Sequence, residues 1–168
     1  MAYSIIELNQ MSQAEFTAAL GAIFEETPVI ASRAWVERPF KDWNHLYQIL
    51  VEQVKAMSET EQLTLIRAHP DLGSRTQMAE ASVKEQAGVG LDRLSYEDYQ
   101  QFNTLNQAYR KKFNFPFIVA VKGRSTSDIL AEFTERLNAA PTVERQTAIA
   151  QILKIAAFRL KDTVTDNC

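Results

Sequence analysis

A histidine stands where a predicted helix has to stop. Apolar residues recur at helical spacing from Glu61 to Ile66, and Pro70 removes a backbone donor and disfavours the α region for His69. A side chain at a helix end is held on one side and can face a cleft on the other, and an imidazole can exchange protons near neutral pH. A histidine in this position also suits a purely structural role, because it interacts favourably with the helix dipole.

Three polar side chains follow at a spacing that favours chemistry. Ser82, Glu85 and Gln86 are three and four residues apart, so on a helix they would project from one face. Gly88 and Gly90 come next and are expected to end that helix. The trio brings together a hydroxyl, a carboxylate and a carboxamide, although a solvated helix face would have the same spacing.

Metal and covalent chemistry find little support in the sequence. It has two histidines and one cysteine, without the His-x-x-x-His or Cys-x-x-Cys spacing of metal sites. A triad of Ser82, His69 and Glu85 can be drawn, but nothing around Ser82 resembles a strained nucleophile turn. We read His45 as a packing or solvent-facing residue. The pattern therefore favours acid–base catalysis by a histidine and a glutamate, with no metal and no other cofactor.

Length and charge limit the partners. With 168 residues and 46% hydrophobic content, the chain suits a single domain over residues 1–168. The net charge of -3 comes from 21 acidic and 18 basic residues that are well mixed, which argues against nucleic acid and membrane surfaces as partners. We expect a small-molecule substrate.

The cysteine content and the chain ends predict a location. The one cysteine, Cys168, is the last residue, so we expect a reducing compartment and an inert thiol. The first residues do not resemble an export signal, and no stretch is long enough to span a bilayer. The final residues, Asp166 to Cys168, are not a peroxisomal address. These features predict a soluble protein of the bacterial cytoplasm.

Capping signals predict an all-α protein. Ser12, Ser58, Ser95 and Ser125 each precede an acidic residue by three positions, as at the first turn of a helix. Asp42 marks a further start. We expect a single-domain helical bundle of about eight helices.

A central helix is predicted near the C-terminus. Residues 143–160 are apolar over more than one face, with Arg159 among them. Such an arginine either extends to water or meets an anion, and the sequence slightly favours water.

One extended segment, Phe115–Val121, resists the helical pattern. It is β-branched and aromatic and contains Pro116, so its composition is typical of a strand. No second run is available to pair with it. We therefore expect an extended segment threaded through the bundle, whose backbone groups need other partners. A bound polar heterocycle could be one of them.

Four ordered motifs resemble the family of 2-oxo-4-hydroxy-4-carboxy-5-ureidoimidazoline (OHCU) decarboxylases. They are Arg67 to Leu72, Ser82 to Gly88, Phe115 to Arg124, and Ile155 to Leu160. The resemblance implies an all-α homodimer without a cofactor, a carboxy-lyase of urate breakdown that converts OHCU into (S)-allantoin and carbon dioxide.

The resemblance also assigns roles to residues. It implies that His69 is catalytic with Glu85 as its partner carboxylate. Asn114 stands where glycine is expected to be common, and asparagine tolerates the same left-handed geometry. The residues implied to contact the substrate are Pro70, Ser82, Gln86, Phe117, Ile118, Val119, Val121 and Arg159.

Two other functions stay open from the residues alone. A different acid–base enzyme that processes ureides on the same scaffold would use the same His–Glu pair. A non-enzymatic helical interaction module would explain the helices and mixed charge, but not the gathering of polar residues. The sequence also does not decide whether His69 or Glu85 delivers the final stereospecific proton, and we favour His69.

Overall fold

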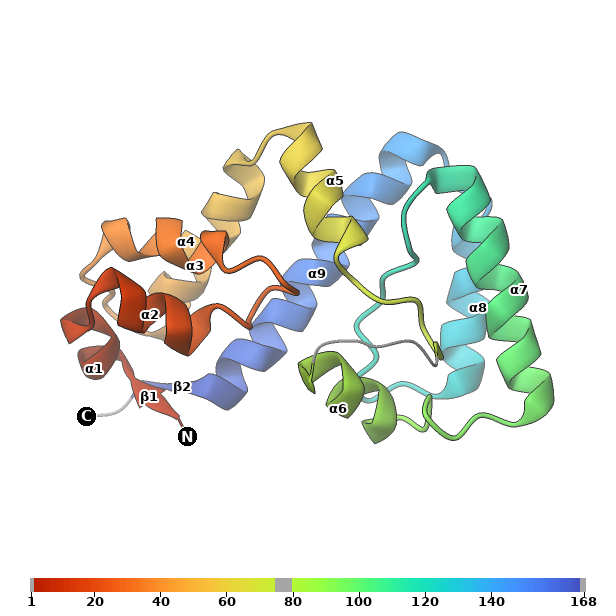
Figure 1. Cartoon of the computed structure of the whole chain (residues 1–168), viewed down its shortest axis with the longest axis horizontal. Coiled ribbons are helices and arrows are strands. Elements are labelled where there is room, and N and C mark those ends of the chain that lie inside the picture. The colour runs from red at the N-terminus through yellow and green to blue at the C-terminus, as the bar shows by residue number, and fades with distance from the viewer. Residues whose placement is uncertain (1, 75–79, 167–168) are drawn as a thin grey trace. The chain divides into compact units, whose positions relative to one another are not determined.

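The chain is all-α, as predicted (Figure 1). In a computed structural model, the structure describes residues 2–74 and 80–166, and these ranges hold nine α-helices, one short 3-10 helix and two strands of two residues each. The prediction of about eight helices came close to this number.

Contacts divide the chain into two compact units. The first unit is Met1–Leu65 with Leu153–Cys168, and the second is Ile66–Ile152. Helices α5 and α9 contribute residues to both, and the single domain expected over residues 1–168 stays a prediction. The first unit contains β1 (Tyr3–Ser4), α1 (Ile5–Gln10), α2 (Gln13–Leu20), α3 (Val29–Ala34), the 3-10 helix η1 (Trp35–Glu37), α4 (Trp43–Ala56), most of α5 (Glu59–Arg67) and β2 (Val164–Thr165). The second contains α6 (Glu80–Gly88), α7 (Tyr96–Phe113), α8 (Thr126–Arg136) and the start of α9 (Pro141–Thr163).

The helix starts are fixed by local hydrogen bonds, and all five predicted caps are confirmed. In each case a side-chain oxygen accepts the backbone N–H three residues later, which satisfies a donor that the first turn leaves without a helical partner. The accepting residues are Ser12 (3.3 Å), Asp42 (2.7 Å), Ser58 (3.2 Å), Ser95 (3.1 Å) and Ser125 (3.1 Å).

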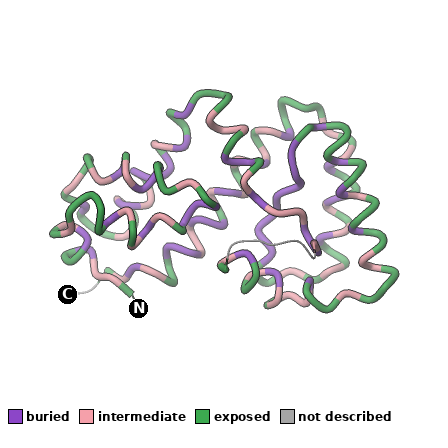
Figure 2. Tube along the Cα trace, viewed as in Figure 1, coloured by how far each residue is buried: buried purple, intermediate pink, exposed green. Residues whose placement is uncertain are grey.

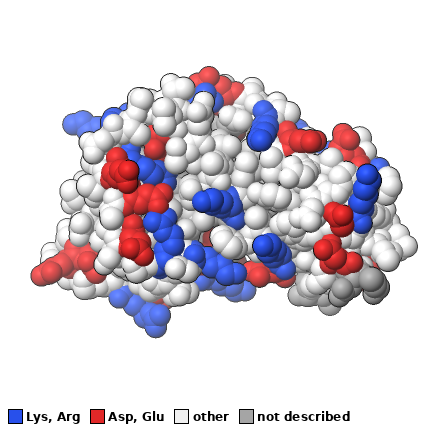
Figure 3. Space-filling model, turned by 180° about the vertical axis from the view of Figure 1, so that it is seen from behind, with Lys and Arg blue, Asp and Glu red and all other residues white. Residues whose placement is uncertain are grey.

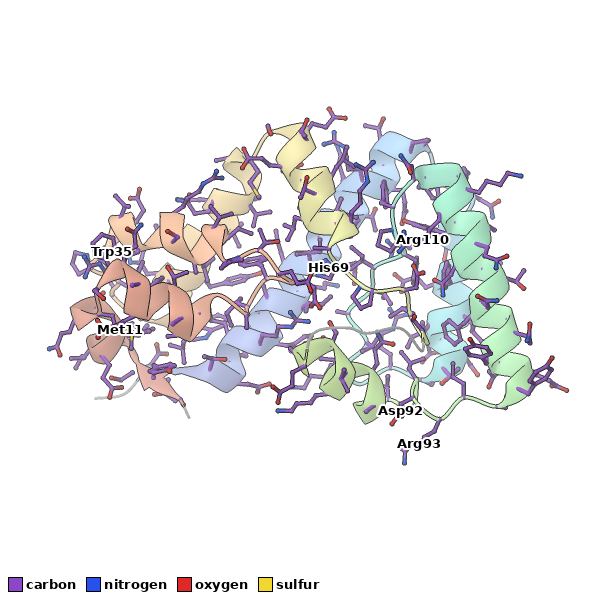
Figure 4. The ribbon with its side chains drawn as sticks, viewed as in Figure 1. Met11, Trp35, His69, Asp92, Arg93 and Arg110 are labelled. Carbon is purple, nitrogen blue, oxygen red and sulfur yellow. The ribbon has the colours of Figure 1, made fainter. Side chains whose placement is uncertain are left out.

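The first unit packs its helices around aromatic and aliphatic side chains. Phe16 of α2 stacks on Phe40 with ring centroids 5.5 Å apart. Trp35 donates its indole N–H to the Met11 carbonyl at 2.9 Å, which fixes the chain between α1 and α2 to η1 (Figure 4). The two strands pair in parallel, so the beginning and end of the described chain lie side by side.

The second unit has an aromatic core centred on Tyr109 of α7. Its ring lies within 6 Å of the ring centroids of Phe113, Phe115, Phe117 and Phe133. The segment that contributes two of these rings, residues 115–121, is buried throughout (Figure 2). It has neither helix nor strand structure, which confirms the prediction of a non-helical segment threaded between helices.

Alkaline unfolding should report on Tyr109. Burial, followed by its hydrogen bond to Glu144, raises the pKa of the Tyr109 phenol well above its usual 10.0. The folded state therefore favours the protonated phenol, so this contribution is complete below pH 10 and decreases as the pH rises further. We expect stability in urea to fall above pH 10, and the fall to be smaller in Tyr109→Phe. The control is Tyr96→Phe at an exposed position, which should keep the wild-type pH dependence. If the free energy of unfolding fell equally with pH in all three proteins, Tyr109 would not be responsible for the fall.

The surface carries both charges. On the face shown in Figure 3, acidic and basic side chains are interspersed. Among the helices described, none is both long and apolar enough to cross a membrane. Cys168, predicted to be inert, lies outside the described residues.

Candidate active site

His69 lies in the loop that follows α5 (Figure 4). The helix ends at Arg67, and the His69 backbone N–H donates to the Ile66 carbonyl at 3.2 Å before Pro70 interrupts the pattern. The imidazole is buried, with 6% exposure. The predicted helix end is confirmed, and His69 is buried where the helix ends.

Four hydrogen bonds hold this loop to the rest of the second unit. Their partners lie on α6, on α7 or at Asn114 directly after α7, and two of the bonds hold the loop backbone itself, at Leu72 and Gly73. The pairs are Arg67 Nε to Asn114 O (3.0 Å), Arg110 Nε to Asp71 Oδ1 (2.8 Å), Asn106 Nδ2 to Leu72 O (2.9 Å), and Gly73 N to Gln86 Oε1 (3.0 Å). A fixed backbone is what a positioned acid–base group requires.

Gly73 is needed where this loop turns towards α6. Its φ is +66°, a left-handed conformation that other residues rarely adopt. A Cβ at this position would also lie 2.9 Å from Leu94 Cδ1. The turn directs the Gly73 N–H to Gln86, and this contact brings α6 against the loop that carries His69.

The trio on α6 is mostly buried. Ser82 and Gln86 are 5% and 6% exposed, and Glu85 between them is half-buried. The alternative of a fully solvated helix face is therefore wrong for two of the three residues. Helix α6 ends at Gly88 as expected, and Gly90 has a φ of +82°.

Side chains of two helices hold the backbone of Phe117–Val121. Arg136 Nη1 of α8 donates to the Ile118 carbonyl at 2.7 Å. The Ala120 N–H donates to Gln151 Oε1 of α9 at 3.0 Å. These contacts supply two of the backbone partners that the sequence required, and both come from side chains.

Arg159 belongs to the first unit. It is 7% exposed, and its Nη2 lies 3.1 Å from Glu25 Oε2 while Nη1 is 3.4 Å and 3.5 Å from the carbonyl oxygens of Ala22 and Ile23. The slight preference for an arginine extending to water was wrong, because a buried carboxylate is available. Burial of both charges is tolerated because they are paired and hydrogen-bonded.

Sequence reasoning missed several residues that support the site. Asn106 and Arg110 are four positions apart on α7 and both contact the His69 loop. The sequence signal that could have identified Asn106 is its position among apolar residues that recur at helical spacing on α7. Arg136, Gln151 and Glu25 gave no such signal, because their partners are distant in the sequence.

The other histidine is used in packing. His45 Nδ1 accepts the Lys41 N–H at 3.2 Å, and its ring lies edge-on to Phe40. Within the described parts of the chain, no group of three or more His, Cys, Asp and Glu side chains is arranged to hold a metal ion.

Comparison with known proteins identifies the family. The model of the OHCU decarboxylase family matches residues 9–161. A 2-oxo-4-hydroxy-4-carboxy-5-ureidoimidazoline decarboxylase of Halalkalicoccus jeotgali is 43% identical over 95% of this chain and 90% of its own length. The uric acid degradation bifunctional protein PucL of Bacillus subtilis is 40% identical over 98% of this chain, which covers 33% of that protein.

A solved structure agrees with these relatives. A crystal structure of (S)-allantoin synthase superimposes with a TM-score of 0.79 at 26% identity, covering 96% of this chain and 54% of that one. The match extends over nearly all of the chain, as the four motifs implied. The chain belongs to the OHCU decarboxylase family.

Proposed function

We propose that this chain decarboxylates 2-oxo-4-hydroxy-4-carboxy-5-ureidoimidazoline to (S)-allantoin, as a carboxy-lyase of urate breakdown. The observation that carries the proposal is the 43% identity to a decarboxylase of that name over nearly the full length of both chains. The buried His69, held in a fixed loop beside α6, supplies an acid–base group of the kind this reaction needs.

The reaction needs proton control rather than an electron sink from a cofactor. When the carboxylate leaves as carbon dioxide, the electron pair of the broken carbon–carbon bond passes into the adjacent carbon–nitrogen double bond of the substrate. The ring nitrogen that receives the electron pair gains a proton, the 4-hydroxyl group loses its proton to become a carbonyl, and the neighbouring ring carbon gains a proton. The enzyme must hold the substrate and deliver that proton to one face.

The residues divide between these tasks. His69 delivers the proton to carbon, and Glu85 orients the imidazole or accepts the hydroxyl proton. Ser82 and Pro70 contact the substrate, and the Gln86 amide nitrogen donates to it while its oxygen holds Gly73.

The remaining contacts come from the main chain and from an arginine. The backbone from Phe117 to Val121 offers amide groups to the ring and ureido group. Arg159 provides planar donors for a carboxylate or a ureide carbonyl. Its pairing with Glu25 fixes the plane of the guanidinium.

Circular dichroism tests the proposed activity. OHCU generated in the assay should be converted to (S)-allantoin much faster than it decays, and the signal of the chiral product should grow with enzyme concentration. The rate should be unchanged after exhaustive chelation with EDTA, because the proposed chemistry uses no metal. Release of ammonia or urea without carbon dioxide would instead favour a ureide hydrolase, and no turnover would favour an interaction module.

We also propose a homodimer, which the family resemblance implies. A pair with two-fold symmetry would use the same surface on both subunits. Light scattering across micromolar concentrations should then give a mass near twice the 19.1 kDa of one chain. A 19.1 kDa species at every concentration would exclude the dimer. A reducing, cytoplasmic location is part of the same proposal and is supported by the single cysteine.

A further inference from the structure

The anchors of the Phe117–Val121 segment lie on either side of a single residue, Val119. The Ile118 carbonyl before it accepts from Arg136, and the Ala120 N–H after it donates to Gln151. The two anchoring side chains come from α8 and α9, so neither depends on the local conformation of the segment. Together they fix both peptide planes that contain Val119 atoms.

Peptide planarity then determines where the Val119 backbone points. In a trans peptide the C=O of one residue and the N–H of the next point in opposite directions, and both peptides here are trans. The Val119 N–H therefore points away from Arg136, and the Val119 C=O points away from Gln151. Val119 is 3% exposed, and within the described residues neither group forms a hydrogen bond. Buried main-chain groups of this kind need a partner.

Arg136 is itself held rigidly. It is 8% exposed, its Nε lies 2.7 Å from Glu144 Oε1, and its Cζ lies 4.3 Å from the centroid of the Phe117 ring. The Phe117 ring stacks on the Phe133 ring, with centroids 3.9 Å apart and an angle of 8° between the ring planes. A guanidinium fixed on three sides cannot follow the carbonyl that it holds, so it sets the position of that carbonyl.

We infer that Arg136 and Gln151 are positioning residues that present the N–H and C=O of Val119 to an amide-type edge of the substrate. An edge with an N–H beside a C=O occurs in both the imidazolinone ring and the ureido group of OHCU, and it complements a donor and an acceptor from one residue. The inference rests on the proposed function for the identity of the ligand. It adds the two residues that prepare the backbone to bind it.

The test compares two substitutions of Gln151. Gln151→Met keeps the length of the side chain and removes the acceptor for Ala120, whereas Gln151→Glu keeps an acceptor. Gln146→Met, on an exposed position of the same helix, is the matched control. Calorimetry with hydantoin and with (S)-allantoin measures binding without turnover, and kinetics with OHCU separate KM from kcat.

We expect Gln151→Met to weaken binding of both ligands and raise KM by roughly three- to tenfold, the usual yield of one hydrogen bond, with kcat almost unchanged. Gln151→Glu and Gln146→Met should bind as the wild type does. Wild-type affinity in a correctly folded Gln151→Met would overturn the inference, as would an equal loss in Gln146→Met.

A second measurement keeps the test decisive if Gln151→Met does not fold. In the wild-type protein, saturating (S)-allantoin should shift the ¹⁵N–¹H signal of Val119 and slow exchange of its amide proton. An unchanged Val119 signal at saturation would overturn the inference. If OHCU is not decarboxylated but hydantoin binding still depends on Gln151, the positioning role stands and the proposed function is wrong.

Discussion

Replacing His69 with alanine should lower kcat for OHCU by about 10² to 10⁴, the usual contribution of general acid–base catalysis. The affinity for (S)-allantoin should change much less, because the proton is handled in the transition state and not in the bound ground state. The His69 loop is held by Asn114, Arg110, Asn106 and Gln86. Loss of the imidazole should therefore leave the loop in place.

Two further substitutions make this result interpretable. His45→Ala removes the other histidine, which packs beside Phe40, and should leave kcat unchanged. Arg159→Ala should mainly weaken binding, since a guanidinium provides fixed charge and does not exchange protons near neutral pH. Near-normal turnover in a folded His69→Ala would mean that the proton comes from Glu85 or from water.

Glu144→Ala should destabilise the protein by about 3 to 5 kcal/mol, which is the cost of removing one partner of a buried ion pair. Glu144 is 1% exposed, receives the Tyr109 hydroxyl at 2.5 Å, and pairs with the buried Arg136. Glu132, 3.3 Å from Arg136, remains as a partly exposed counter-ion and offsets some of the loss. The Tyr109 hydroxyl also loses its acceptor, and this increases the loss of stability.

The measurement is the urea midpoint at constant m-value. Glu144→Gln, which keeps an acceptor for Tyr109 but not the charge, should fall between Glu144→Ala and the wild type. Glu135→Ala, an exposed acid on α8, should change the free energy of unfolding by no more than about 0.5 kcal/mol. A Glu144→Ala protein within about 1 kcal/mol of the wild type would show that solvent already screens this pair.

Local features of the fold were predictable because local chemistry causes them. A serine or aspartate oxygen and the N–H three residues later meet within one turn, so the caps at Ser12, Asp42 and Ser125 could be read directly. Pro70 likewise ended a helix before His69. The absence of a second strand-like run was enough to exclude a sheet around residues 115–121.

Contacts between distant residues could not be predicted in this way. Arg159 and Glu25 are separated by 134 positions, and nothing near either residue indicates the other. Gln151 is an ordinary polar position on a helix until the Ala120 N–H is placed beside it. The sequence therefore indicated which residues could perform the chemistry, whereas the side chains that position the backbone around them required the structure.

The parallel pairing of β1 and β2 has a consequence for protein engineering. Tyr3 lies opposite Val164 and Ser4 opposite Thr165, and the Trp43 N–H at the start of α4 also donates to Asp166. The strands near the two ends of the described chain are thus adjacent in one unit (Figure 1). Adjacent ends tolerate circular permutation, so a short linker could join them while a new start is opened in the surface turn at residues 138–140. Reporters fused to the new ends of such a permuted chain would lie at the α8–α9 turn, and the linker between β2 and β1 would be an internal loop.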